Sequence, residues 1–126
     1  MRLLLDTQVF LWWCADDRRL GEAEREAIRD EANDVFLSAA SVWEMAIKQA
    51  LGRLQVPERP STVVARLGID RLPITFEHAE ATARLPALHR DPFDRLLVAQ
   101  AKVEGLTLVT TDPLVRSYPG VVFLPA

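Results

Sequence analysis

Short apolar runs alternate along this chain with segments of helical periodicity, and this alternation predicts an α/β domain built on a parallel sheet. The runs are apolar at consecutive positions, as expected of strands that helices cover on both faces. The predicted strands are residues 2–5, 34–37, 71–74, 106–110 and 121–124. The third strand contains Pro73, which cannot donate a backbone hydrogen bond, so an edge position is expected for it.

Helices are predicted between the strands, at residues 8–14, 22–32, 39–51, 60–67, 76–85 and 92–104. The last has the clearest ends, because Asp91 can cap it, Pro92 suits the first helical position and Gly105 suits the end. Ser38 is the expected cap of the third helix. In the second helix, Ala23, Ala27 and Ile28 are expected to face the core, opposite a charged face.

Composition fits an ordinary globular protein: 126 residues, 49% of them hydrophobic and 26% charged. The early apolar stretch, residues 9–15, is too short to cross a bilayer, and it lacks the pattern of a secretion signal. The single Cys14 cannot form an internal disulfide and is expected to be buried and inert beside Trp12 and Trp13. We therefore expect a cytoplasmic protein that does not enter membranes.

Two carboxylates stand directly after predicted strands: Asp6 follows the first and Asp112 follows the fourth. Ligands of open parallel sheets bind at the carboxyl ends of strands, so both positions suit a functional site. Each also has a simpler interpretation. Asp6 can cap the following helix with help from Thr7, and Thr111-Asp112-Pro113 is an ordinary turn or helix start.

Two further carboxylates lie in predicted helices. Asp94 shares a helix face with Leu97, Val98 and Ala101, so it is expected to point toward the interior or a cleft, although a first-turn acid also suits the helix dipole. Glu44 precedes Lys48 by four residues, which is the spacing of a surface ion pair.

The four carboxylates are more informative together than singly. In a doubly wound sheet, all four positions converge on one end, where the charges would repel one another unless a cation lay between them. Carboxylate oxygens are the ligands preferred by hard cations, so Mg²⁺ or Mn²⁺ is the expected cofactor. The candidate catalytic and metal-binding residues are Asp6, Glu44, Asp94 and Asp112.

Other chemistry finds little support in the sequence. There is no Cys/His set for zinc, no glycine-rich phosphate loop and no nucleophile elbow. His78 is expected to be exposed and His89 to be a solvated loop residue, although His89 could face the site. The net charge of −3 counts weakly against nucleic-acid binding.

Four sequence blocks carry a family resemblance: Leu-Asp-Thr at 5–7, Ser-Val-Trp-Glu at 41–44, Asp-Pro-Phe-Asp-Arg at 91–95 and Thr-Thr-Asp at 110–112. In order and spacing, this chain resembles a PIN-domain protein, and specifically a VapC-type toxin ribonuclease of a type II toxin–antitoxin system. The resemblance implies one PIN-like domain over residues 1–126, with a parallel sheet in the order 3-2-1-4-5 flanked by helices.

The resemblance also implies a function. It predicts an endoribonuclease that is usually a homodimer and is held inactive by a small antitoxin encoded beside it. Asp6, Glu44, Asp94 and Asp112 would hold the Mg²⁺ or Mn²⁺ that activates water to hydrolyse RNA. Thr7, Ser41, Arg95 and Thr111 are the candidate substrate contacts.

Two alternatives stay open at this point. One is a catalytically silent or housekeeping PIN-like module that only binds nucleic acid. The other is a receiver domain that accepts a phosphoryl group, but such a domain needs adjacent acids after the first strand and a late lysine. Here Thr7 follows Asp6, and no lysine follows Lys102.

Overall fold

The computed structural model describes residues 1–125, and within them a parallel sheet has the strand order β3-β2-β1-β4-β5. The strands are β1 (Arg2–Leu5), β2 (Asp34–Ser38), β3 (Asp70–Leu72), β4 (Thr107–Val109) and β5 (Val122–Leu124). Both the α/β class and the strand order that we expected are therefore confirmed.

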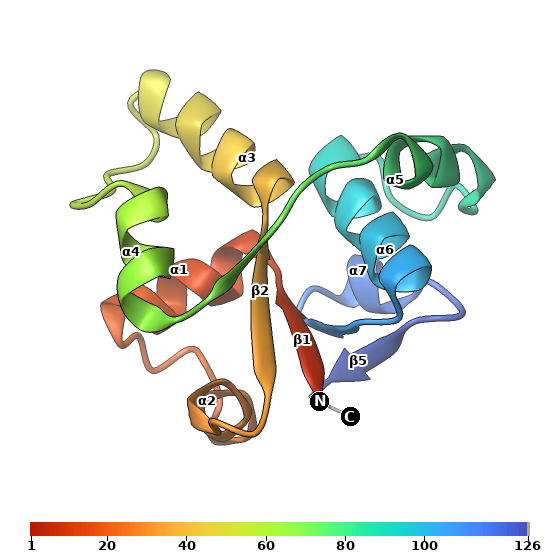
Figure 1. Cartoon of the computed structure of the whole chain (residues 1–126). Helices are drawn as coiled ribbons and strands as arrows, with labels where there is room; N and C mark the ends of the chain where they lie inside the picture. Colours follow the sequence, from red (N-terminus) through yellow and green to blue (C-terminus); the bar gives the residue numbers. More distant parts are fainter. Residues whose placement is uncertain (126) are drawn as a thin grey trace.

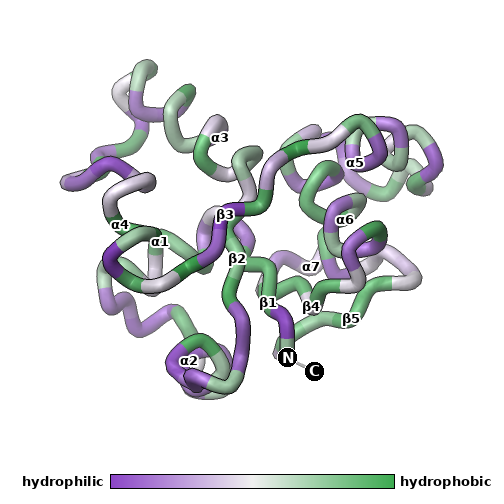
Figure 2. Tube along the Cα trace, in the orientation of Figure 1, coloured by the Kyte–Doolittle hydropathy of each residue, from purple (hydrophilic) through white to green (hydrophobic). Residues whose placement is uncertain are grey.

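The central strand β1 has a hydrophobic core on each side. Leu3, Leu4 and Leu5 are fully buried, and because successive side chains of a strand point to opposite faces, Leu3 and Leu5 join one core and Leu4 the other. Leu5 is paired with Leu37 of β2 and with Val109 of β4. This is why the strands are apolar at consecutive positions, as the hydropathy colouring along β1 and β4 also indicates (Figure 2).

Helices cover both faces of the sheet (Figure 1). The core that contains Leu3 and Leu5 is closed by α1 (Thr7–Ala15), α2 (Glu22–Arg29), α3 (Ala39–Ala50) and α4 (Pro60–Leu67). The core that contains Leu4 is closed by α5 (Phe76–Ala81), α6 (Pro92–Glu104) and the short α7 (Pro113–Arg116). No helix among residues 1–125 is long and apolar enough to cross a membrane.

Helix ends follow the capping residues where the sequence supplies them. Asp91 accepts hydrogen bonds from the backbone N–H groups of Phe93 and Asp94, and Gly105 ends α6 with a φ of 67°. Ser38 caps α3 through the N–H of Ala40. These caps were predicted, and α6 has the predicted bounds.

Other bounds differ from the prediction. The third strand ends at Leu72, so Pro73 follows it, although β3 does lie at the sheet edge. The second helix ends at Arg29 because Asp30 is extended, and its buried face carries Glu24 with Ala27 and Ile28, while Ala23 is exposed.

The fifth predicted helix is divided into α5 and a 3-10 turn, η1 (Thr82–Arg84). Helix α7 was not predicted, because four residues are too few to show the helical spacing of hydrophobic positions.

Two further predictions of burial, those for His78 and Cys14, were wrong. His78 is buried, not exposed: its Nδ1 accepts a hydrogen bond from the Thr75 N–H, and its Nε2 lies 2.8 Å from Glu104 on α6. Cys14 is exposed, not buried, and lies near the C-terminal end of α1.

Candidate functional site

The carboxyl ends of β1 and β4 lie side by side and bring the first two acids together. Asp6 directly follows β1, and its N–H donates to the carbonyl of Val109, the last residue of β4. Asp112 follows three residues later and caps α7 through the N–H of Leu114. Glu44 from α3 and Asp94 from α6 line the same pocket, so all four predicted acids converge.

Asp6 is both a helix cap and a pocket residue. Its Oδ1 accepts a hydrogen bond of 2.7 Å from the N–H of Val9, and only 7% of the residue is exposed. Burial raises the pKa of Asp6 above its usual value, and the charges of Asp112 and Glu44 add to this. The Thr110 hydroxyl and the Val9 N–H oppose it. The capping role therefore coexists with a burial that disfavours the charged carboxylate, and an adjacent cation would favour that charge.

Glu44 is held at both carboxylate oxygens. The Thr7 hydroxyl donates to Oε1 over 2.6 Å, and the Lys48 ammonium lies 2.9 Å from Oε2. The expected pair with Lys48 therefore exists, but Glu44 is buried and Lys48 also lines the pocket. Glu44 is thus fixed in orientation rather than free on the surface.

Asp94 lies in the first turn of α6, with a half-buried carboxylate. Burial and the neighbouring charge of Asp91 raise the pKa of Asp94 to about 6, while a contact with His89 opposes this rise. His89 Nε2 lies 2.8 Å from Asp94 Oδ2, and 16% of the His89 side chain is exposed. The expectation that His89 would be a solvated loop residue is therefore wrong.

The four predicted substrate contacts are in different situations. Thr7 and Thr111 line the pocket, and Thr111 is exposed. Ser41 is buried, with its Oγ 2.9 Å from the Thr7 hydroxyl, so it supports the site from beneath. Arg95 is used elsewhere: its guanidinium donates to the carbonyls of Thr82 and Pro86 and to the Tyr118 hydroxyl.

The candidate site residues left out Lys48, which lines the pocket, and His89, which contacts Asp94, although the sequence had left open that His89 faces the site. Lys48 could have been included, because it was expected to pair with Glu44, and a side chain that pairs with an acid of the pocket must itself reach the pocket. His89 gave no such signal, because it lies in an irregular segment whose path depends on tertiary contacts.

A divalent cation fits the residues that are present. Asp6, Asp94 and Asp112 offer hard carboxylate oxygens, and one ligand atom from each of His89, Asp94 and Asp112 lies within 4.8 Å of the others. Burial disfavours the charge of Asp6 and Asp94, and an adjacent cation would favour it. Among the residues that line this pocket, Lys48 is the one basic group.

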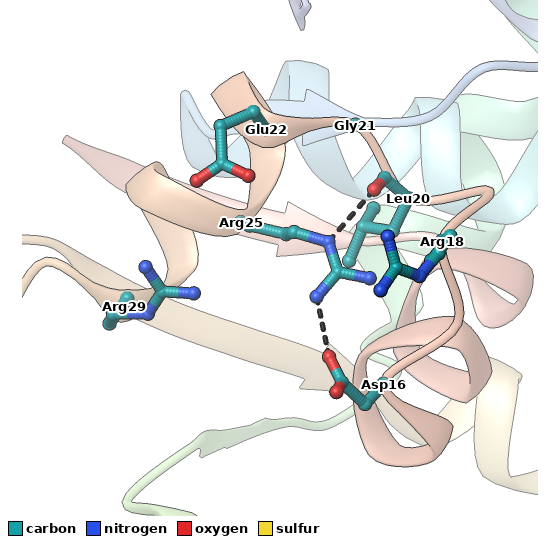
Figure 3. Close-up of a pocket in the computed structure, with 7 residues that line it drawn as sticks. All are labelled: Asp16, Arg18, Leu20, Gly21, Glu22, Arg25 and Arg29. Atoms are coloured by element: carbon teal, nitrogen blue, oxygen red, sulfur yellow. Dashed lines mark hydrogen bonds and ion pairs between the residues drawn. The ribbon is translucent and has the colours of Figure 1, made fainter.

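A second hollow lies between α2 and the loop before it (Figure 3). Arg25 crosses it and donates to the carbonyls of Leu20 and Asp17 and to the Asp16 carboxylate. The nitrogens of its guanidinium are therefore all used in holding the loop against α2. This arrangement serves the fold and gives no indication of catalysis.

The fold and the site together define an α/β protein with an acidic pocket at the carboxyl edge of a parallel sheet. Residues 3–120 match the family model described as PIN domain, and the chain belongs to the PIN-domain family. The expected family resemblance is thereby confirmed.

Its relatives include two proteins of Mycobacterium tuberculosis. Ribonuclease VapC22 is 33% identical over 119 residues, which cover 92% of this chain and 91% of that protein. Ribonuclease VapC16 is 38% identical over 64 residues, which cover 48% of this chain and 44% of that protein.

Similar solved structures include VapBC2 from Rickettsia felis bound to a promoter DNA fragment, with a TM-score of 0.68 and 16% identity over 98% of this chain and 97% of that one. DNA-bound VapBC from Salmonella typhimurium has a TM-score of 0.67 and 18% identity over 98% of this chain and 96% of that one. At these identities the likeness supports the fold.

Proposed function

We propose that this protein is a metal-dependent endoribonuclease, acting as the toxin of a toxin–antitoxin pair through one PIN-type domain over residues 1–126. The observation that carries the proposal is the convergence of Asp6, Glu44, Asp94 and Asp112 on one pocket. Membership of the PIN-domain family and the similarity to Ribonuclease VapC22 over 92% of the chain support the reaction and the substrate class.

The residues of the pocket have distinct roles in this proposal. Asp6, Asp94 and Asp112 hold Mg²⁺ or Mn²⁺, which would supply water activation and charge neutralisation at the phosphodiester. Glu44, fixed by Thr7 and Lys48, lies close enough to Asp6 and Asp94 for its charge to raise the pKa of both. It either completes the ligand set or accepts a proton from the attacking water. Thr111, which lines the pocket and is exposed, would contact the RNA backbone.

The partner that restrains the toxin is proposed to be a small antitoxin. An apolar groove lies beside the acidic pocket, between α1 and α4, and Trp12, Trp13, Leu54, Val63 and Leu67 are among its lining residues. The indole N–H of Trp12 is buried without a hydrogen-bond partner among residues 1–125. A helix of the antitoxin could cover this groove and place an arginine or lysine near Asp6 and Asp94.

The protein is also proposed to form a homodimer, and the proposed contact between the two copies is an exposed apolar surface on α3. Val42, Trp43 and Ile47 of α3 and Leu51 directly after it are exposed, and Trp43 is 59% exposed. An exposed apolar row on one helix commonly marks a contact with another protein. Because the proposed substrate is cellular RNA, the proposed location is the cytoplasm.

Cleavage of RNA by purified, antitoxin-free protein tests the proposal. We expect cleavage of a single-stranded RNA with Mg²⁺ or Mn²⁺, none with EDTA, and a loss of at least ~100-fold in Asp6→Asn, as for other groups that act directly at a reacting centre. Asp70→Asn, which changes an exposed acid of β3 outside the pocket, should cleave normally.

Cleavage that persists in EDTA would contradict the metal-dependent mechanism. Binding of RNA without any cleavage would favour the alternative, a silent nucleic-acid-binding module of the same family.

A further inference from the structure

His89 lies just outside the acidic cluster and touches one member of it. Its Nε2 is 2.8 Å from Oδ2 of Asp94, and its side chain is largely buried. Oδ1 of Asp94 accepts no hydrogen bond from the described part of the chain, residues 1–125. The two oxygens of this carboxylate are therefore not equivalent.

The hydrogen bonds around the imidazole assign its tautomer. Nδ1 of His89 accepts a hydrogen bond of 3.0 Å from the backbone N–H of Arg90, so Nδ1 carries a lone pair. In a neutral imidazole the proton must then lie on Nε2. Nε2–H therefore donates to Oδ2 of Asp94. The position of this proton is assigned from the pattern of hydrogen bonds around the ring.

The backbone that carries the imidazole is also held in place by hydrogen bonds. The backbone N–H of His89 donates to the hydroxyl of Tyr118 over 3.1 Å, and Tyr118 is buried. Arg95 donates to the same hydroxyl and to the carbonyl of Pro86. The segment before α6, helix α6 itself and Tyr118 are thus joined in one network that holds the backbone of His89 beside α6.

We propose that His89 is a positioning residue, which holds Oδ2 of Asp94 so that Oδ1 is presented to a divalent cation in the pocket. The proposal rests on the metal site proposed above and adds to it a residue that acts through Asp94. Partners that orient a ligand in this way typically contribute about 10–100-fold to metal affinity.

Direct ligation by His89 is the competing arrangement, because its ligand atom lies within 4.8 Å of those of Asp94 and Asp112. To ligate through Nε2, the ring would need its proton on Nδ1. That proton would face the N–H of Arg90, so two donors would oppose each other where a hydrogen bond now exists. The observed geometry therefore favours positioning over ligation.

Two substitutions separate these roles. Gln in place of His89 can still donate from a nitrogen near the position of Nε2, whereas Leu keeps much of the bulk and donates nothing. Arg90→Ala is the matched control, because it changes the exposed neighbour and leaves its backbone N–H in place. Circular dichroism melts would establish that each variant is folded before metal is added.

The measurement is the dissociation constant for Mn²⁺, followed by electron paramagnetic resonance of free Mn²⁺ in the absence of RNA. We expect His89→Leu to bind Mn²⁺ about 10–100-fold more weakly than wild type, and His89→Gln and Arg90→Ala to stay within roughly 3-fold. Cleavage by His89→Leu should recover at saturating Mn²⁺.

The proposal is overturned if His89→Leu binds Mn²⁺ as tightly as wild type, or if His89→Gln is as weak as His89→Leu. A directly coordinated ¹⁴N in the electron spin-echo spectrum of Mn²⁺-loaded wild type would show ligation and also overturn it. Failure of wild type itself to bind Mn²⁺ would instead refute the metal site of the proposed function.

Discussion

Asp6 serves the fold and the site with the same carboxylate. Oδ1 caps α1, and the group as a whole lies in the acidic pocket with a pKa raised by burial. Asn can still accept the capping hydrogen bond but carries no charge, whereas Ala loses both functions. Asp6→Asn therefore isolates the role of the charge, and this is why it is the variant chosen for the cleavage assay.

Asp94 gives a prediction about stability and pH. Its pKa of about 6 in the folded protein exceeds the ordinary value of 3.8, so between these values the native state holds a proton that the unfolded chain releases. Stability of the metal-free protein therefore falls as pH rises through this window, by an upper bound of roughly 3 kcal/mol for this group.

Asp94→Asn removes that cost. In EDTA at pH 7 we expect the variant to be at least as stable as wild type, with the difference shrinking as pH falls toward 4. Mn²⁺ should raise the melting temperature of wild type more than that of the variant, through binding to the native state. Thermal melts at several pH values test this, and a variant much less stable than wild type at pH 7 in EDTA would favour a purely structural role for Asp94.

At the scale of elements, the bounds of helices and strands were predicted best where capping or breaking residues mark both ends of the element. Asp91, Pro92 and Gly105 define α6 to the residue. The second helix was predicted three residues too long, because its C-terminus has no glycine or proline to end it. The edge strand β3 was misplaced by one residue at its start and two at its end, since three residues carry little pattern.

The candidate site was predictable only in part, for a related reason. Acids after strands can be read from the chain, because strand order carries them to one edge. The contacts of His89 and Arg95 could not be read from the chain, because His89 itself and Pro86, an acceptor of Arg95, lie in the irregular segment between η1 and α6.

Gly105 gives a prediction at this scale. Its φ of 67° is in the left-handed region, and a Cβ added there would meet nothing within 4 Å, so substitution costs backbone strain and no clash. Gly105→Ala should lower the free energy of unfolding by about 1 kcal/mol. Gly105→Asn should lose less, since Asn tolerates this conformation. Urea unfolding measures both, and an equal loss in the two variants would contradict the explanation.

At the scale of the whole molecule, exposed apolar side chains line the groove between α1 and α4 and form the row on α3. If the groove receives an antitoxin, expression of this chain alone should arrest growth. Co-expression with the adjacent small gene should restore growth and yield a stable complex. Asp6→Asn should be harmless when expressed alone. A folded, metal-loaded wild type that leaves growth unchanged would contradict the toxin assignment.

The central claim is that the carboxyl edge of the sheet holds a divalent cation. Crystals of the metal-free protein soaked in Mn²⁺, with data collected near the manganese absorption edge, test it most directly. We predict an anomalous difference peak between the carboxylates of Asp6, Asp94 and Asp112, absent in Asp94→Asn at the same Mn²⁺ concentration. No peak in this pocket of the wild-type protein, or a peak only at other carboxylates, would contradict the account.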